Sequence, residues 1–186
     1  MHRRTLLGAA VLLSHGLPPA AHAQASGPSP WPEVQANLPD GRWSGSARLR
    51  FWGFDVYDAQ LWVAPSFTAA QYSQHPLALS LTYLRTLRGQ AIAERSLTEM
   101  RRQGQISAEQ ESVWLPAMQA LFVDVSANDR LTGLHQPGLG ARFWLNARPL
   151  GNLADAGFSQ RFFGIWLDTA SSEPELRRNL LARAAP

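Results

Sequence analysis

Cysteine and lysine are both missing from this chain of 186 residues, and histidine is rare. Without cysteine the chain can form no disulfide, thiolate metal site or iron–sulfur cluster, so its core alone must hold the fold. All 17 basic residues are arginine, scattered in runs of no more than two. Nucleic-acid binding needs a concentrated basic surface, and this pattern offers none, so we expect no nucleic-acid partner.

Recognisable catalytic and cofactor motifs are also missing. Beyond residue 23 the only histidines are His75 and His135, which lie far apart and in no metal-ligand spacing. The chain has no phosphate-binding loop, no nucleophile elbow and no dinucleotide-binding glycine pattern. We therefore expect no metal and no cofactor, and the motifs assign no catalytic residue.

The first 23 residues have the composition of an export signal. Arg3 and Arg4 precede a short apolar run, and Ala21-His22-Ala23 forms a small-residue cleavage site. The run is too short to span a bilayer, and a buried N-terminal helix is the alternative interpretation. We expect a periplasmic or secreted protein, exported by the general secretory or the twin-arginine route. Its mature chain carries 15 arginines against 14 acidic residues and has no transmembrane segment.

The remainder of the chain has the length of one domain. Residues 24–40 begin with a stretch rich in Pro, Ser and Gly, which predicts a flexible lead-in. Residues 41–186 are predicted to form the folded domain, and nothing in the pattern sets its oligomeric state.

Three strands are predicted at the start of this domain. Residues 42–52 alternate between apolar and polar side chains, as expected for a half-buried strand. Residues 54–63, FDVYDAQLWV, continue beyond Gly53 as the second arm of a hairpin. A third apolar strand is predicted at 77–88.

The pattern then changes to helices. Residues 90–104 and 107–122 have helical spacing, and Ser107 with Gln110 forms a capping-box pattern, while Pro116 predicts a kink or a split. Strand patterns return at 129–137 and 141–151, and two helices follow at 154–167 and 171–184. Strands and helices in separate runs predict an α+β fold, with a mainly antiparallel sheet and helices on one face.

Three segments in order carry a resemblance to a known family. They are GSARLRFWGFDVYDAQLW (45–62), NDRLTGLHQPGLGARFWLNARPLG (128–151) and FSQRFFGIWL (158–167). Together they resemble the chalcone isomerase-like family, in its bacterial exported branch. This resemblance implies an open-faced β-sandwich with a ligand cleft between a large sheet and its helical layer.

The resemblance also implies candidate ligand-binding residues. Members of the superfamily include true isomerases and fatty-acid-binding proteins, and both hold an anionic ligand oxygen with a strand arginine. The matching residue here is Arg48, with Tyr57 or Asp58 at the supporting polar position. The helix Tyr and Asn of the true isomerases match Gly89 and Ser96, so the isomerase site is incomplete.

The resemblance therefore favours a non-catalytic binder of a small amphipathic carboxylate, such as a fatty acid. Adjacent residues of a strand face opposite ways. We expect Tyr57 to share the cleft with Arg48, Trp62 to pack nearby, and Asp58 to pair with an arginine such as Arg50.

Two alternatives stay open. The first is an isomerase or lyase that uses Tyr57 or Asp58 as its acid or base. The second is an envelope protein-interaction module that uses Trp43, Trp52 and Trp144 on the open sheet face.

Overall fold

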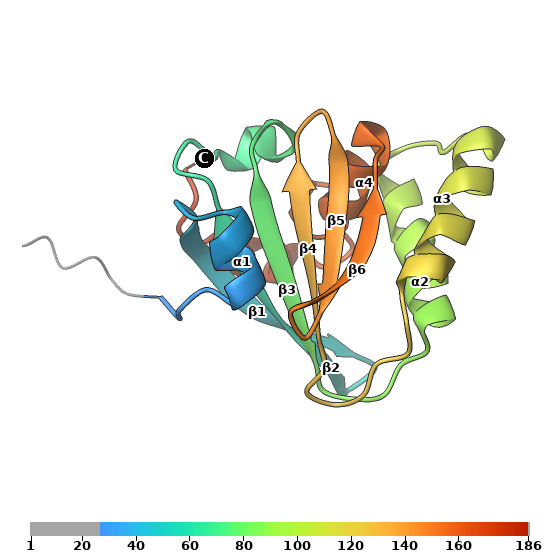
Figure 1. Cartoon of the computed structure of the whole chain (residues 1–186), viewed down its shortest axis with the longest axis horizontal. Coiled ribbons are helices and arrows are strands. Elements are labelled where there is room, and N and C mark those ends of the chain that lie inside the picture. Colours follow the sequence, from blue (N-terminus) through green and yellow to red (C-terminus); the bar gives the residue numbers. More distant parts are fainter. Residues whose placement is uncertain (1–26, 186) are drawn as a thin grey trace, which may run out of the picture.

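A computed structural model describes residues 27–185 of the chain (Figure 1). The predicted export signal, 1–23, lies outside the described residues. Within the described range, no helix is long and apolar enough to cross a lipid bilayer.

One six-stranded sheet forms the centre of the fold, with its strands in sequence order and every neighbouring pair antiparallel. The strands are β1 (Arg42–Phe51), β2 (Phe54–Val63), β3 (Leu77–Tyr83), β4 (Arg130–Gln136), β5 (Gly140–Leu145) and β6 (Arg148–Leu153). Each strand therefore turns back beside the one before it, which gives the antiparallel sheet expected from the sequence.

Helices cover one face of this sheet (Figure 1). They are α2 (Gly89–Met100), α3 (Ala108–Leu121), α4 (Ala156–Leu167) and α5 (Pro174–Leu180), with short 3-10 turns η1 (Ala69–Gln74) and η2 (Arg101–Gln103). Helix α5 packs so closely on β1 that a Cβ atom at Gly45 would lie 2.1 Å from the Asn179 carbonyl oxygen. The fold is thus α+β with a helical layer on one face, as predicted.

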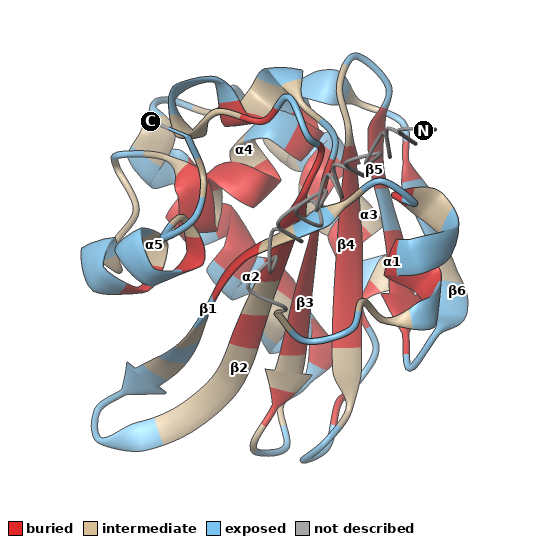
Figure 2. Cartoon of the chain, turned by 90° about the vertical axis from the view of Figure 1, so that its left-hand side faces the viewer, coloured by how far each residue is buried: buried red, intermediate tan, exposed pale blue. Residues whose placement is uncertain are grey.

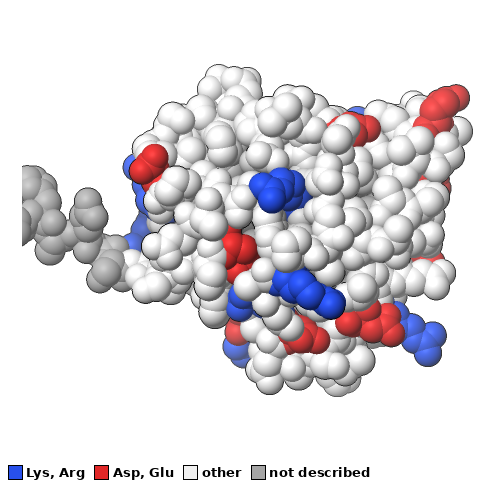
Figure 3. Space-filling model, in the orientation of Figure 1, with Lys and Arg blue, Asp and Glu red and all other residues white. Residues whose placement is uncertain are grey.

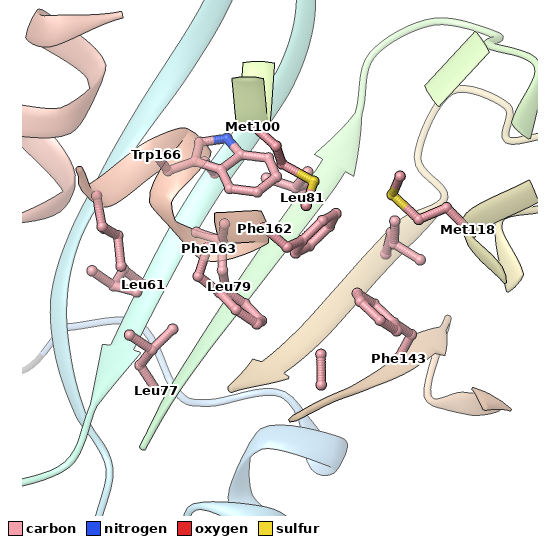
Figure 4. Close-up of a cluster of buried hydrophobic side chains, with 14 of the residues drawn as sticks. Leu61, Leu77, Leu79, Leu81, Met100, Met118, Phe143, Phe162, Phe163 and Trp166 are labelled. Carbon is pink, nitrogen blue, oxygen red and sulfur yellow. The ribbon is translucent and has the colours of Figure 1, made fainter. Parts of the chain in front are cut away.

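The main core fills the space between the sheet and these helices. In Figure 4, Phe162, Phe163 and Trp166 of α4 lie among the leucines of β2 and β3. Burial of these side chains is the dominant favourable contribution to folding, at about 1.5–3 kcal/mol for each fully buried large apolar residue. A chain without disulfides depends on this core for its stability.

The other face of the sheet is partly covered by α1 (Pro32–Asn37), and this corrects the predicted lead-in. The flexible segment was expected to run to residue 40, but Val34 of α1 is buried against a second apolar cluster. Glu33 is buried as well, and its carboxylate binds Arg130 and Thr132 of β4. These contacts join residues almost 100 positions apart, so composition near the N-terminus could not reveal them.

Several smaller predictions are also settled. The capping box of Ser107 and Gln110 is present, but α3 is one helix that contains Pro116, so the predicted split is wrong. The strand predicted at 141–151 is two strands, β5 and β6, joined by Asn146 and Ala147 with φ of 50° and 69°. This left-handed turn was missed because a type I′ hairpin usually has glycine second, where alanine stands here.

Candidate functional site

A cavity of about 340 Å³ lies between the inner face of β1–β3 and helices α2 and α4. Most of its lining is apolar, including Leu49, Val56, Leu81, Ile92 and Phe162. Small-molecule sites are typically concave and apolar, with a few polar groups that orient the ligand. The polar side chains of this cavity are therefore the candidates for specific contacts, and they are Tyr57, Tyr83, Arg85, Arg95, Ser96, Glu99, Ser172 and Glu173.

Strand pairing explains which residues enter the cavity. Leu49 of β1, Tyr57 of β2 and Tyr83 of β3 are direct neighbours across the sheet and share its helical side. Because side chains alternate along a strand, Arg48, Asp58 and Thr82 form the next row and face the opposite side. The register thus places two tyrosines side by side in the site.

The phenol of Tyr57 is oriented by a helix residue. The indole Nε1–H of Trp166 donates a hydrogen bond of 2.9 Å to the Tyr57 hydroxyl oxygen. Burial raises the pKa of Tyr57, an effect that outweighs the Trp166 hydrogen bond, which lowers it. The phenol therefore stays protonated at neutral pH and keeps its own O–H as a donor.

Tyr83 presents a second phenol next to the first. The two rings meet edge to face with centroids 6.0 Å apart. Burial raises the pKa of Tyr83, and the neighbouring Tyr57 raises it further. Neither hydroxyl donates a hydrogen bond to any group in residues 27–185. The site therefore holds two neutral donors that no protein acceptor within this range uses.

Helix α2 contributes the charged part of the lining. Arg95 lies at the exposed end of the cavity, over the ring of Phe51, and its Nη2 is 2.7 Å from Oε1 of Glu99. Glu99 is buried, and its Oε2 makes no hydrogen bond to any group in residues 27–185, with Nε of Arg102 at 3.8 Å. Ser96 donates its hydroxyl proton to the Ile92 carbonyl and retains only acceptor capacity.

Arg48 does not line this cavity, so its predicted placement beside Tyr57 is wrong. Its Nε and Nη2 bind the two carboxylate oxygens of Asp58 at 2.7 and 2.8 Å, and Nη1 binds Asp55 at 2.9 Å. These contacts, Asp58 foremost, raise the pKa of Arg48. The guanidinium lies on the exposed outer side of the hairpin, away from the two phenols.

Asp58 and Arg50 also lie outside the cavity. Asp58 faces away from Tyr57, as the alternation predicted, but its partner is Arg48. Arg50 instead binds Asp55 at 2.6 Å, and this contact is the main reason that the pKa of Asp55 is lowered. Asp55 and Asp58 of β2 therefore neutralise Arg48 and Arg50 of the facing strand.

Trp62 packs on the opposite side of the sheet, and its predicted position near the cleft is wrong. It belongs to the second apolar cluster, under α1, together with Val34, Leu134 and Trp144. Trp144 is buried there and Trp43 is partly buried against the same cluster, so of the three tryptophans proposed as an interaction surface only Trp52 is strongly exposed. The outer face of the sheet thus has an apolar cluster of its own.

Tyr83, Arg95, Glu99 and Trp166 were not identified as site residues from the sequence. Tyr83 carried the clearest signal, because it lies in the strand predicted at 77–88, which was expected to belong to the same sheet as Tyr57. The other three come from helices, and their approach to β2 depends on packing that periodicity does not encode. In residues 27–185 no group of three or more His, Asp or Glu side chains is arranged to hold a metal ion.

Comparison with known proteins gives this site its context. The model of the chalcone isomerase-like family matches residues 44–182, which is most of the chain. The chain belongs to the chalcone isomerase-like family. An uncharacterized protein of Haemophilus influenzae is 33% identical over 139 residues, which cover 75% of this chain and 67% of that protein.

The chalcone isomerase-like fold is also seen in a more distant solved structure. A fatty-acid binding protein of Arabidopsis thaliana superimposes with a TM-score of 0.61 at 11% identity, over 76% of this chain and 87% of that one. At this identity the likeness establishes the shared fold. The family resemblance places the helix Tyr and Asn of true isomerases at Gly89 and Ser96, and here Gly89 has no room for a side chain, because a Cβ would lie 2.0 Å from the Phe122 carbonyl oxygen.

Proposed function

We propose that this chain is an exported, non-catalytic chalcone isomerase-like protein that binds a small amphipathic carboxylate, such as a fatty acid, in its cavity. The observation that carries the proposal is the pair of unused phenol donors, Tyr57 and Tyr83, at an otherwise apolar cavity. The likeness to a fatty-acid binding protein of the same fold supports it.

The chemistry of the lining suits a ligand with one polar end. A carboxylate accepts several hydrogen bonds and can take one from each neutral phenol. The apolar walls formed by residues such as Leu49, Leu81 and Phe162 would cover a hydrocarbon chain. Ionised phenols would repel the ligand, but their raised pKa values keep both neutral at physiological pH.

Arg95 replaces Arg48 as the candidate cation. It stands at the exposed end of the cavity and is already paired with Glu99. Because the guanidinium is more than half exposed and partly neutralised, its contribution to affinity should be small, on the order of 1 kcal/mol or less. The two phenols are then the principal polar contacts, and Arg95 adds a favourable field at the entrance.

A non-catalytic role agrees with the departures from the isomerase pattern. The position that matches the isomerase tyrosine is Gly89, and the position that matches the asparagine is Ser96, whose hydroxyl proton is used within α2. Oxyanion stabilisation by placed donors is usually the largest single contribution to this kind of catalysis. Loss of both residues leaves a site better suited to holding a ligand than to converting it.

The test is a calorimetric titration of the full chain and three variants with dodecanoate. Tyr83→Phe should weaken binding by about 0.5–1.5 kcal/mol, because one neutral hydrogen bond is lost. Arg95→Gln should weaken it by less, and Arg48→Gln is the matched control that should leave affinity unchanged. Native mass spectrometry of the purified protein should also show a bound lipid.

Two results would contradict the proposal. The first is a wild-type chain that binds no fatty acid and carries no lipid. The second is an affinity that falls in Arg48→Gln but not in Tyr83→Phe, which would move the site to the outer face of the hairpin.

A further inference from the structure

The tip of the β1–β2 hairpin exposes three aromatic side chains. Phe51, Trp52 and Phe54 are 47%, 87% and 62% exposed, and they make up half of the exposed large apolar residues in the described part of the chain. Figure 2 shows this hairpin extending beyond the rest of the sheet. Burial of these rings against a binding partner would be favourable, so their exposure indicates an interaction surface.

The backbone at the tip makes the tryptophan more unusual. Trp52 has φ of 50° and Gly53 has φ of 80°, so both central residues of the turn are left-handed. Asparagine or glycine is preferred in such a turn, and a bulky residue there is a conformational outlier. The indole lies beside the ring of Phe51, with 6.1 Å between the ring centroids, and is otherwise largely exposed. Trp52 therefore adds little stability to the folded domain to offset the cost of its left-handed backbone conformation.

Arginines stand directly beside the aromatic rings. The guanidinium of Arg85 lies 5.1 Å from the Phe54 ring centroid, and that of Arg95 lies 5.3 Å from the Phe51 ring centroid. Arg85 makes no ion pair within residues 27–185, and it is exposed. Aromatic rings with guanidinium groups close beside them suit the surface of an anionic bilayer, where acyl chains lie beneath phosphates.

The tip lies at the entrance of the cavity. Phe51, Arg85 and Arg95 belong to its lining and are also exposed, whereas Tyr83 and Trp166 at the inner part are buried. The aromatic tip and the cavity entrance thus lie at the same end of the molecule.

We propose that this end of the molecule docks onto an anionic lipid bilayer, with Phe51, Trp52 and Phe54 inserted and Arg85 at the phosphates. A protein partner fits less well, because a stable protein interface buries roughly 800 Å² on each side. Three rings on a protruding turn do not provide such a surface. In Figure 3 basic and acidic side chains lie close together at the lower end of the molecule, where the hairpin is, so insertion of the rings must supply most of the affinity.

The experiment is co-sedimentation of the full chain with vesicles of equal parts phosphatidylglycerol and phosphatidylcholine. The double variant Trp52→Ser with Phe54→Ser should lower the partition coefficient by about tenfold or more, since two inserted rings are lost. Leu139→Ser is the matched control, because Leu139 is 66% exposed but lies in the β4–β5 turn at the opposite end of the sheet. It should leave partitioning unchanged.

A local probe separates this docking from any membrane affinity of residues 1–26. The chain has no cysteine, so a Thr86→Cys substitution gives a single labelling site in the exposed β3–α2 connection, next to Arg85. An environment-sensitive dye at this site should shift to the blue on vesicle addition, and the shift should vanish in the double tip variant. The same dye at a Leu139→Cys substitution should not respond.

Three outcomes would overturn the proposal. They are a dye at position 86 that does not respond to vesicles, a double tip variant that partitions like the wild type, and an equal response from the dye at position 139. Docking does not require a ligand, so Tyr83→Phe should bind vesicles like the wild type. A wild-type chain that binds vesicles but no fatty acid would refute the proposed function and leave the docking surface standing.

Discussion

The indole nitrogen of Trp166 in α4 donates a 2.9 Å hydrogen bond to the phenol oxygen of Tyr57 in β2. This bond connects the helical layer to the sheet inside the cavity. Because the Tyr57 oxygen is the acceptor, its own proton remains available to another group. One contact therefore holds the ring in place and leaves its hydroxyl proton for a ligand in the cavity.

This relationship predicts different effects for two similar substitutions. Tyr57→Phe removes the acceptor of a buried indole N–H, so the free energy of unfolding should fall by about 1–3 kcal/mol. Tyr83→Phe removes a hydroxyl that makes no hydrogen bond in the described residues, so stability should change little. Urea denaturation of both variants checks this, and equal losses would show that the Trp166 contact is unimportant.

Chalcone cyclisation should not be detectable above the spontaneous rate. The reaction needs a stabilised oxyanion, and the helix positions that help to provide it in true isomerases match Gly89 and Ser96. The decay of chalcone absorbance measures the rate, with a plant chalcone isomerase as positive control. A rate above background that falls in Tyr83→Phe would show that the cavity is catalytic.

Helix α1 should depend on one buried ion pair. The Glu33 carboxylate accepts hydrogen bonds from Arg130 at 3.0 Å and Thr132 at 2.7 Å, and its side chain is almost fully buried. Glu33→Gln leaves the Arg130 cation without its partner, which should cost about 3–5 kcal/mol of unfolding free energy. The exposed Glu175→Gln is the control and should change stability by less than about 0.5 kcal/mol. Thermal or urea unfolding measures the loss of unfolding free energy in each variant. Similar losses in both variants would contradict the structural role of the pair.

The sequence predicted local features well, because they depend on neighbouring residues. Alternation in FDVYDAQLWV correctly set Tyr57 and Asp58 on opposite faces, and the capping box correctly placed Ser107 as the N-cap of α3. The family resemblance supplied the sheet with its helical layer, which the element order alone also favoured.

The sequence could not show which face of β1 and β2 looks into the cavity. Both faces carry large apolar residues, with Leu49 and Leu61 on one side and Trp62 on the other, because both sides of the sheet are covered. A register shift between Leu49 and Arg50 further disturbs the alternation near the tip. Arg48 was therefore assigned to the wrong side, and Arg95, which comes from a helix, was missed.

Export should leave Gln24 as the first residue, which follows from the small residues at Ala21 and Ala23. Intact mass of the protein recovered from the periplasm of a bacterial host would identify the cleavage site. Substituting Ala23→Arg should block cleavage, because a large charged side chain does not fit the small-residue site. A full-length product that accumulates in the cytoplasm of the host would refute the predicted localisation.

His135 should make the stability depend on pH below about pH 6.5. Its Nδ1 is 2.6 Å from the Ser159 hydroxyl oxygen and its Nε2 is 2.9 Å from the Ser73 carbonyl oxygen, so the ring sits in a buried polar pocket beside Phe163. Burial lowers the pKa of His135, and the Ser73 carbonyl offsets this only in part. The folded protein therefore binds a proton less readily than the unfolded chain, whose histidine has a pKa of about 6.5.

The sign of the effect follows from this difference. The stabilising contribution of neutral His135 is fully present above about pH 6.5 and is lost as the pH falls toward the lower pKa of the folded state. The slope of unfolding free energy against pH can reach about 1.4 kcal/mol per unit for one proton. Urea unfolding between pH 8 and pH 5 should show this slope in the wild type and a smaller one in His135→Gln. His75→Gln controls for the loss of a histidine as such, and a slope that disappears there but persists in His135→Gln would refute the assignment.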